Sequence, residues 1–340
     1  MQDSKEQESM QAIVDIHGHV TAPLALYAYQ AGLMSARAFH GKGSIRATEE
    51  EILEAALPHV QRLKDYGISR QFISPRPYSM MHSRKPEVIV QWFIETVNDI
   101  IAAQVAEYPD SFVGVAGLPQ SAGVCPSNSV EELRRCVLEL GFVGCVLNPD
   151  PGEGDYATPG LGDEWWYPLY EAMVELDVPG LVHATACSNP RESYSNHFIT
   201  EESIAVMSLV DSNVFTDFPD LKLIISHGGG SVPYQYGRWQ AQRVQKGRED
   251  FSESLKRLWF DTVLYNKESL ELLFKIVGPE RCLFGTETPG IGSGADRVTG
   301  QFMDDLAPVI DSIDFLGEDE KAAVFSGNAR EVFSRWNGID

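Results

Sequence analysis

The chain has 340 residues, with 27 Lys and Arg against 49 Asp and Glu, which gives a formal net charge of −22 at pH 7. This balance argues against nucleic-acid binding, which needs a basic surface, but it permits a locally cationic pocket for a small anionic substrate. Hydrophobic residues make up 43% of the chain, as in soluble globular proteins, and no apolar run approaches the roughly 20 residues that cross a membrane.

The N-terminal residues and the cysteines give two further predictions. Residues 1–11 are polar and lack the apolar core of a signal peptide, so we expect a disordered N-terminal tail followed by a single domain over residues 12–340. The five cysteines are scattered and form no CxxC pair, which predicts a reduced, cytoplasmic protein. Cys136, Cys145 and Cys282 lie in apolar segments and are predicted to fill the core.

Eight short apolar runs follow one another along the chain, most of them separated by helical patterns. Each run is bounded by polar, Gly or Pro residues, which is typical of strands buried on both faces of a parallel sheet. The predicted strands are 12–16, 69–73, 112–117, 142–147, 178–183, 221–226, 258–264 and 281–286. The predicted helices are 49–66, 86–108, one starting at 129, 166–176, 201–215, 267–277, 301–313 and 318–333. Eight such units predict an α/β fold, a (β/α)8 TIM-like barrel.

Four connections are too long to be simple turns. They cover residues 19–48, 148–163, 184–200 and 288–300, and each follows the end of a predicted strand. In a parallel barrel such βα loops lie over the C-terminal face, where active sites form. The last loop is rich in glycine, and two interpretations stay open for it: a moving lid or a flexible surface loop.

Residues suited to metal binding end three separate strands. His17 and His19 are two positions apart, so both imidazoles face the same side of the first strand, and Gly18 between them adds no bulk. His183 ends the fifth strand and Glu287 follows the eighth. Although an HxH motif alone is weak evidence, three imidazoles and one carboxylate form a donor set for one divalent ion, with Zn²⁺ favoured.

A further histidine, His227, ends the sixth strand and begins the segment His-Gly-Gly-Gly. An imidazole titrates near neutrality, so His227 is the candidate acid–base group that does not bind the metal. The alternative is a structural residue that only holds a metal ligand in place by hydrogen bonding.

The arrangement of these motifs resembles the amidohydrolase superfamily, and in particular its branch related to aminocarboxymuconate semialdehyde decarboxylase. The resemblance extends from His17 to Phe333. Further segments are similar to the 4-oxalomesaconate hydratases of that branch: Ser74-Pro75-Arg76, Leu118-Pro119-Gln120-Ser121, Gly141-Phe142-Val143-Gly144-Cys145 and Asn148-Pro149-Asp150-Pro151. The wider superfamily usually has Asp where this chain has Glu287, and the hydratases also carry Glu there.

The resemblance implies a metal-dependent hydro-lyase that adds water reversibly to an unsaturated oxo-tricarboxylate, such as 4-oxalomesaconate, in aromatic-acid catabolism. It also implies a homo-oligomer, a dimer or larger. The alternative is a carbon–carbon bond enzyme of the same branch, either an aromatic-acid decarboxylase or a meta-cleavage-product hydrolase. A third, non-catalytic metal-binding protein is disfavoured because four ligand-type residues and His227 are all present.

Within this hypothesis Glu287 and His227 are the expected catalytic residues, and Glu287 both binds the metal and carries a proton. A polycarboxylate needs cationic and hydrogen-bonding partners, because Arg binds a carboxylate through two parallel hydrogen bonds. The candidate substrate-binding residues are Arg76, Asn148, Arg191, Tyr194, His197 and Arg238. For two of them a structural role stays open as the alternative to substrate binding. Arg76 could form a salt bridge to a barrel loop, and Asn148 could stabilise a turn. In the hydratases we expect a tyrosine near His197, so Tyr194 is displaced along its loop.

Overall fold

The computed structural model describes residues 12–155 and 157–338, so the predicted tail over residues 1–11 lies outside the described part. All eight predicted strands are present, each shifted or shortened by a few residues. They are β1 (Val14–His19), β2 (Arg70–Ser74), β3 (Phe112–Gly114), β4 (Cys145–Leu147), β5 (Gly180–Val182), β6 (Leu223–Ile225), β7 (Trp259–Asp261) and β8 (Cys282–Leu283). Every pair of neighbouring strands is parallel.

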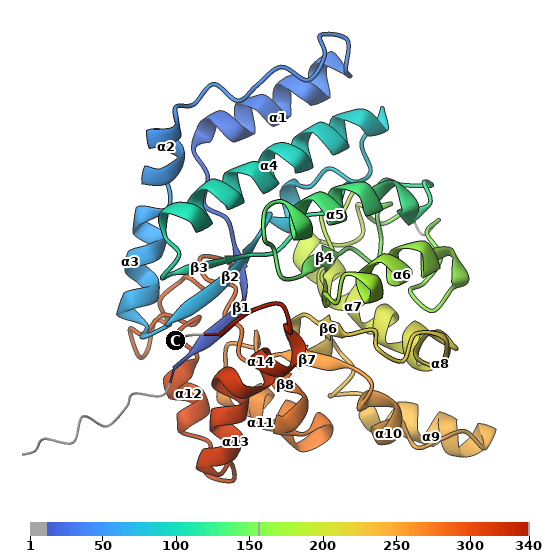
Figure 1. Ribbon diagram of the computed structural model, residues 1–340. Coiled ribbons are helices and arrows are strands. Elements are labelled where there is room, and N and C mark those ends of the chain that lie inside the picture. The colour runs from blue at the N-terminus through green and yellow to red at the C-terminus, as the bar shows by residue number, and fades with distance from the viewer. Residues whose placement is uncertain (1–11, 156, 339–340) are drawn as a thin grey trace, which may run out of the picture.

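The strands form a barrel because hydrogen bonds join the two groups β1-β2-β3 and β4-β5-β6-β7-β8 at both seams. Between β3 and β4, the amide of Ala116 donates to the carbonyl of Gly144 at 2.9 Å. Between β8 and β1, the amide of Ile16 donates to Phe284 at 2.9 Å and the amide of Glu287 donates to His17 at 2.8 Å. The predicted barrel is confirmed, and Figure 1 shows its helices arranged around the strands.

The helices follow the predicted pattern with several changes. The helix predicted over 201–215 begins at Tyr194, inside the connection predicted over 184–200, and the helix predicted over 318–333 is divided by a π-helical turn over Ala323–Gly327. The predicted helix 49–66 is divided into α2 (Glu49–Glu54) and α3 (Leu57–Asp65), the predicted helix 301–313 keeps only a short segment, and α1 (Leu24–Ala36) lies inside the long connection 19–48. The others are α4 (Glu87–Glu107), α5 (Val130–Leu138), α6 (Tyr167–Glu175), α7 (Tyr194–Val210), α8 (Val214–Asp217), α9 (Tyr236–Lys246), α10 (Phe251–Leu255), α11 (Lys267–Val277), α12 (Ala307–Asp311), α13 (Glu318–Ala322) and α14 (Asn328–Val332).

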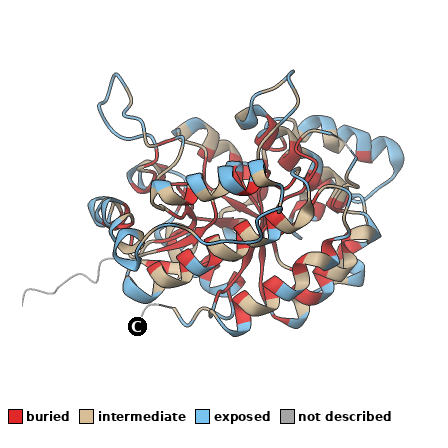
Figure 2. Cartoon of the chain, turned by 90° about the horizontal axis from the view of Figure 1, so that it is seen from above, coloured by how far each residue is buried: buried red, intermediate tan, exposed pale blue. Residues whose placement is uncertain are grey.

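The barrel interior is closed at one end by packed apolar side chains. Val14, Ile16 and Phe72 belong to one buried cluster with residues of the other strands and with Phe333, which follows α14. The rings of Phe72 and Phe333 meet edge to face at 4.6 Å. Figure 2 shows this buried centre within a more exposed outer layer. Because this end is filled, the opposite strand ends are left to build a site.

The layer between strands and helices is equally apolar and contains the three cysteines expected there, Cys136, Cys145 and Cys282. α4 is the one described helix long and apolar enough to cross a membrane. Its residues Phe93 and Ile101 are fully buried in the core cluster, so α4 is a helix of the barrel layer. Such burial is what an apolar helix of a globular protein needs.

Candidate metal centre and active site

The HxH motif on β1 brings two imidazoles together at the C-terminal end of the barrel. The Nε2 atoms of His17 and His19 lie 3.3 Å apart. Gly18 faces the other way, toward Gln71, and a Cβ atom at this position would lie 2.2 Å from the Gln71 side chain. Glycine is therefore required here by the close approach of β2, and the alternation of the strand orients both histidines as predicted.

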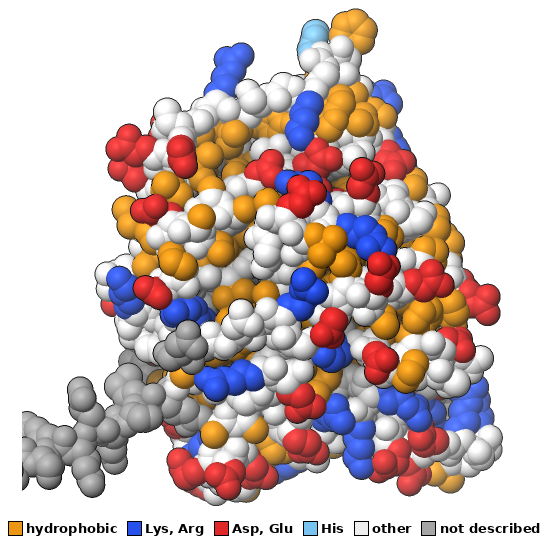
Figure 3. Space-filling view, in the orientation of Figure 1, with side chains coloured by type: hydrophobic (Ala, Val, Ile, Leu, Met, Phe, Trp, Pro, Cys, Tyr) orange, Lys and Arg blue, Asp and Glu red, His pale blue; other side chains and the backbone are white. Residues whose placement is uncertain are grey.

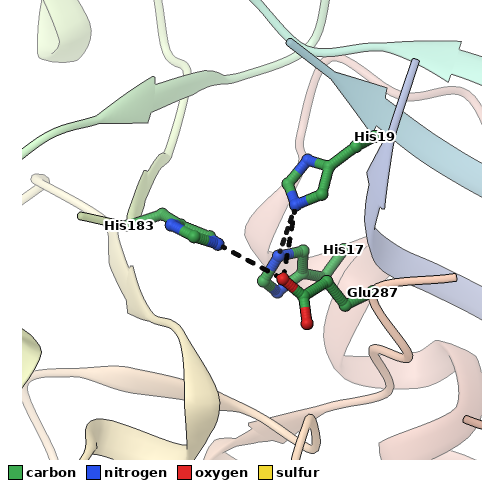
Figure 4. A group of neighbouring side chains, drawn as sticks. All are labelled: His17, His19, His183 and Glu287. Carbon is green, nitrogen blue, oxygen red and sulfur yellow. Dashed lines mark hydrogen bonds and ion pairs between the residues drawn. The ribbon is translucent and has the colours of Figure 1, made fainter. Parts of the chain in front are cut away.

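His183 and Glu287 complete the predicted group of four. Oε1 of Glu287 lies 3.8 Å from Nε2 of His19 and 3.9 Å from Nε2 of His183. One donor atom from each of the four residues lies within 4.8 Å of the others, and all four side chains are buried. Figure 4 shows these side chains directed toward a common point.

The second nitrogen of each of these imidazoles has its own partner. Nδ1 of His17 lies 2.6 Å from Oδ2 of Asp261, Nδ1 of His19 lies 3.0 Å from Oγ of Ser74, and Nδ1 of His183 lies 2.6 Å from the carbonyl of Ala184. With Nδ1 donating, each Nε2 presents a lone pair to the site, which is the usual arrangement of metal-binding histidines.

His183 gives an independent test of whether a metal fits. Its Nε2 atom is shielded from solvent and has no hydrogen-bond partner among the described residues. A buried acceptor without a partner is costly, and a cation at the common point would satisfy it. Three imidazole nitrogens and one carboxylate oxygen match the donors of a divalent transition metal.

The protonation states favoured by the surroundings also suit a metal. Burial lowers the pKa of His17, and it holds that of His19 well below the usual range. Burial alone would raise the pKa of Glu287, but the neighbouring histidines 183, 19 and 227 hold it well below the ordinary value. The imidazoles of His17 and His19 are thus neutral and the carboxylate is charged, the forms in which these groups bind metals.

His227 lies beside this group and has a different environment. Its Nδ1 atom lies 2.9 Å from both carboxylate oxygens of Glu202, and its Nε2 lies 3.8 Å from Oε1 of Glu287. Burial would lower the pKa of His227, but the charges of Glu202 and Glu287 raise it well above the usual range. His227 therefore enters the site as a protonated imidazole, able to donate from Nε2.

The backbone around the site is strained at three non-glycine residues. His227, Tyr265 and Glu287 have φ values of 49°, 58° and 60°, in the left-handed region. Such conformations cluster at functional sites, where the surrounding structure holds them. The Tyr265 hydroxyl donates to Oε2 of Glu287 at 2.5 Å, so the two strained residues hold each other in place.

Sequence reasoning missed the buried polar residues that support the ligands. Asp261 at the end of β7 accepts hydrogen bonds from the amides of Gly228 and Val263 in addition to its contact with His17. Asp15 on β1 accepts from the Thr286 hydroxyl at 2.6 Å, and burial raises the pKa of Asp15 to about 7. Both carboxylates lie within predicted apolar strands, where an acidic residue is the signal that could have found them.

A pocket of about 400 Å³ opens from the metal group to the surface. Its wall includes His19, Glu287, Arg76, Tyr194 and Phe198, together with residues 289–293 of the glycine-rich loop. Nη1 of Arg76 donates to the Pro289 carbonyl at 3.0 Å. Two predicted substrate-binding residues, Arg76 and Tyr194, therefore line this pocket, and the loop over residues 288–300 forms part of its wall. Arg62 also lines it and was not predicted.

Four other predicted substrate-binding residues lie elsewhere. Asn148 is buried, and its amide nitrogen contacts Nδ1 of His82 at 2.9 Å and the Thr185 hydroxyl at 2.8 Å. Arg191 and Arg238 are exposed, and neither is among the residues that line the pocket. Their substrate-binding roles remain predictions that this pocket does not support.

His197, the fourth, is buried between acidic side chains. Its Nδ1 lies 3.2 Å from Glu192 and its Nε2 lies 3.4 Å from Asp150. Burial, followed by the charge of Asp150, raises the pKa of the adjacent Glu201 to about 7. His197 is thus part of a polar cluster behind the loop after β5 and not of the pocket wall.

Comparison with known proteins agrees with this fold. Residues 14–335 match the amidohydrolase family model, and the chain belongs to this family. It is 37% identical to 2-keto-4-carboxy-3-hexenedioate hydratase of Sphingobium sp. (strain NBRC 103272 / SYK-6), over 96% of this chain and 97% of that protein. The resemblance predicted from the sequence is confirmed.

Two further relatives are a hydratase whose structure is solved and a decarboxylase. The crystal structure of 4-oxalomesaconate hydratase from Rhodopseudomonas palustris superposes with a TM-score of 0.87 at 31% identity, covering 95% of this chain and 96% of that one. A 2-amino-3-carboxymuconate-6-semialdehyde decarboxylase of Dictyostelium discoideum is 27% identical, over 80% of this chain and 74% of that protein.

Proposed function

We propose that this protein is a metal-dependent hydro-lyase that adds water reversibly across the carbon–carbon double bond of an unsaturated oxo-tricarboxylate, such as 4-oxalomesaconate. The observation that carries the proposal is the 37% identity to a hydratase along nearly the whole of both chains. The reaction must stabilise an enolate beside a ketone and assist a poor leaving group, and the group of four candidate ligands with His227 beside it offers side chains for both tasks.

His17, His19, His183 and Glu287 are proposed to hold one divalent ion, and we favour zinc because three imidazoles and a carboxylate suit its preferred geometry. When bound, the ion would supply Lewis acidity that polarises an oxygen atom of the substrate or of water. Manganese is the alternative to test, since the same donors also bind it.

Glu287 and His227 are proposed to move the two protons of the reaction. In the dehydration direction Glu287 takes a proton from the carbon next to the ketone, and His227 gives a proton to the departing hydroxyl group, which leaves as water. In hydration the roles reverse: His227 receives a proton from the attacking water, and Glu287 delivers one to the carbon. Oε1 of Glu287 and Nε2 of His227 lie 3.8 Å apart, so both groups reach the same substrate.

Arg76 is proposed to bind a substrate carboxylate at the pocket wall. Its guanidinium is fixed by the hydrogen bond to Pro289, which leaves its remaining N–H groups available in a planar fork. Tyr194 is proposed to contact the substrate from the pocket mouth, where it is 49% exposed. This placement would give the displaced tyrosine a binding role rather than a chemical one.

The carbon–carbon bond reactions are the second candidate, supported by the likeness to a decarboxylase over 80% of the chain. The test is to mix the metal-loaded protein with 4-oxalomesaconate and record both ultraviolet absorbance and CO₂ release. Hydration removes the conjugated double bond without releasing CO₂, whereas decarboxylation releases it. A metal-loaded protein that leaves the absorbance unchanged contradicts the hydratase proposal.

We also propose that the protein is cytoplasmic and forms a homo-oligomer. The support for association is the exposure of large apolar side chains at both ends of α1: Leu24 at its start and Phe39 just after its end are 84% and 88% exposed. Figure 3 shows hydrophobic side chains near this end of the molecule, among charges of both signs. Exposed apolar residues of this size are typical of contact surfaces. Sedimentation at several concentrations tests this, and a monomer at all of them would contradict it.

A further inference from the structure

Arg62, in the last turn of α3, lines the same pocket as Arg76, His19 and Glu287. Its guanidinium carbon lies 5.3 Å from the centre of the Phe302 ring, which supports the plane of the group. The two arginines come from different elements, since Arg76 follows β2. The pocket therefore has two guanidinium groups in its wall in addition to the metal-binding side chains.

The Nη1 atom of Arg62 is shielded from solvent and has no hydrogen-bond partner among the described residues. Its nearest carboxylate is that of Asp304, whose Oδ2 lies 4.0 Å away. Asp304 is already bound by other donors, the Tyr66 hydroxyl at 2.8 Å and the Ser293 hydroxyl at 2.5 Å. Asp304 thus leaves the hydrogen-bonding capacity of Arg62 unused.

A shielded N–H group of a charged side chain without an acceptor is unfavourable, and a carboxylate is its best partner. The Arg62 side chain as a whole is 30% exposed, so its guanidinium can turn toward a carboxylate that enters the pocket, which Arg62 and Arg76 both border. We propose that Arg62 and Arg76 form a carboxylate-binding subsite that makes the enzyme select tricarboxylates over dicarboxylates. This inference rests on the proposed function, because it identifies the feature of the substrate that the pocket recognises.

The experiment measures binding of two unreactive acids to the zinc-loaded protein by isothermal titration calorimetry. Tricarballylate carries three carboxylates and glutarate carries two on the same five-carbon chain. The wild-type protein should bind tricarballylate more tightly, and Arg62→Met should weaken that binding by about 10- to 100-fold while changing glutarate binding little, since one charge-assisted contact is lost. Arg62→Lys should fall between the two. Equal losses for both acids, or no loss for either, would overturn the subsite.

Two controls separate this role from a structural one. Arg134→Met changes an arginine outside the pocket that pairs with Glu175, so binding of both acids should stay at the wild-type level. Asp304→Asn removes the charge nearest to Arg62. If Arg62 serves only to pair with Asp304, this variant loses tricarballylate binding as Arg62→Met does, and the subsite is refuted. Preserved selectivity in Asp304→Asn supports it.

Because neither acid is converted, the result does not depend on the hydration reaction. A protein that binds tricarballylate selectively through Arg62 but leaves 4-oxalomesaconate unchanged would contradict the proposed function and keep the subsite. A protein that hydrates 4-oxalomesaconate but shows no loss of selectivity in Arg62→Met would support the proposed function and contradict the subsite.

Discussion

Nδ1 of His17 lies 2.6 Å from Oδ2 of Asp261, and both side chains are fully buried. This pair joins the end of β7 to β1, the strand that carries two of the proposed metal ligands. It fixes which nitrogen of His17 carries the proton and thus directs Nε2 toward the proposed position of the ion. Oδ1 of Asp261 also accepts from the amide of Gly228, next to His227, so one carboxylate positions parts of three strand ends.

Asp261→Asn should weaken metal affinity about 10- to 100-fold, as expected when the partner of a metal-binding histidine is changed. The amide keeps the size of the side chain but accepts a hydrogen bond less strongly than a carboxylate. Competition with a zinc-binding dye measures the affinity, and Asp311→Asn on α12 is the matched control outside the site. Wild-type affinity in Asp261→Asn would show that the pair does not support the metal.

Glu287→Gln should lower turnover by about 100-fold or more, because the amide cannot accept the proton that the proposed reaction requires. The free energy of unfolding should change far less than the rate. Steady-state kinetics and urea unfolding of the same preparation compare the two, with metal content measured in parallel. A variant with full metal content and an unchanged rate would exclude Glu287 as the proton carrier.

Arg76→Met should raise KM by about 10-fold or more with a smaller change in kcat, since it removes binding that substrate and transition state share. Arg191→Met is the informative comparison because Arg191 is exposed and lies outside the residues that line the pocket. Its kinetic constants should match the wild type. If Arg191→Met raised KM and Arg76→Met did not, the substrate would bind elsewhere than in this pocket.

Glu201→Gln should change how stability depends on pH. Burial raises the pKa of Glu201 to about 7 in the folded protein, above its ordinary value of 4.5. Between these values the unfolded chain releases a proton that the folded protein retains, so the carboxyl group favours folding at low pH and this contribution is lost as the pH rises toward 7. The variant lacks this loss and should gain about 1 kcal/mol over the wild type between pH 4.5 and pH 8.

Urea unfolding at the two pH values measures this gain, with Glu171→Gln on the exposed side of α6 as the control. Solvent screening of this partly accessible group makes the expected gain smaller than the full shift implies. An equal stability difference at both pH values would contradict the assignment of Glu201 as a carboxyl group that stays protonated near neutrality.

The parts of the molecule that follow from local sequence were predictable. Strand periodicity placed His17 and His19 on one face, and the order of eight strand–helix units gave the barrel, so the convergence of His183 and Glu287 follows from topology. α11 (Lys267–Val277) agrees with its predicted range because its N-cap Asn266, whose side chain accepts from the amide of Ser269, and its terminal Gly278 mark both ends in the sequence.

The parts of the molecule that depend on tertiary contacts could not be predicted from the sequence. α1 lies in a connection for which the sequence predicts no helix, because its apolar side chains form no clear helical stripe; its packing against α4 is a tertiary contact. Arg62 reaches the pocket only because α3 and the loop after β8 approach each other through Asp304, and no local pattern encodes that contact. For the same reason an arginine in a βα loop, such as Arg191, could not be distinguished from one in the pocket wall.

We propose above all that His17, His19, His183 and Glu287 hold one divalent ion that the reaction requires. The most direct measurement is metal content and turnover of 4-oxalomesaconate in the same preparations of wild-type protein and His183→Ala. We predict one equivalent of metal and full activity for the wild type, and loss of both for a variant that remains folded. Retention of one equivalent and normal turnover in His183→Ala would contradict the claim.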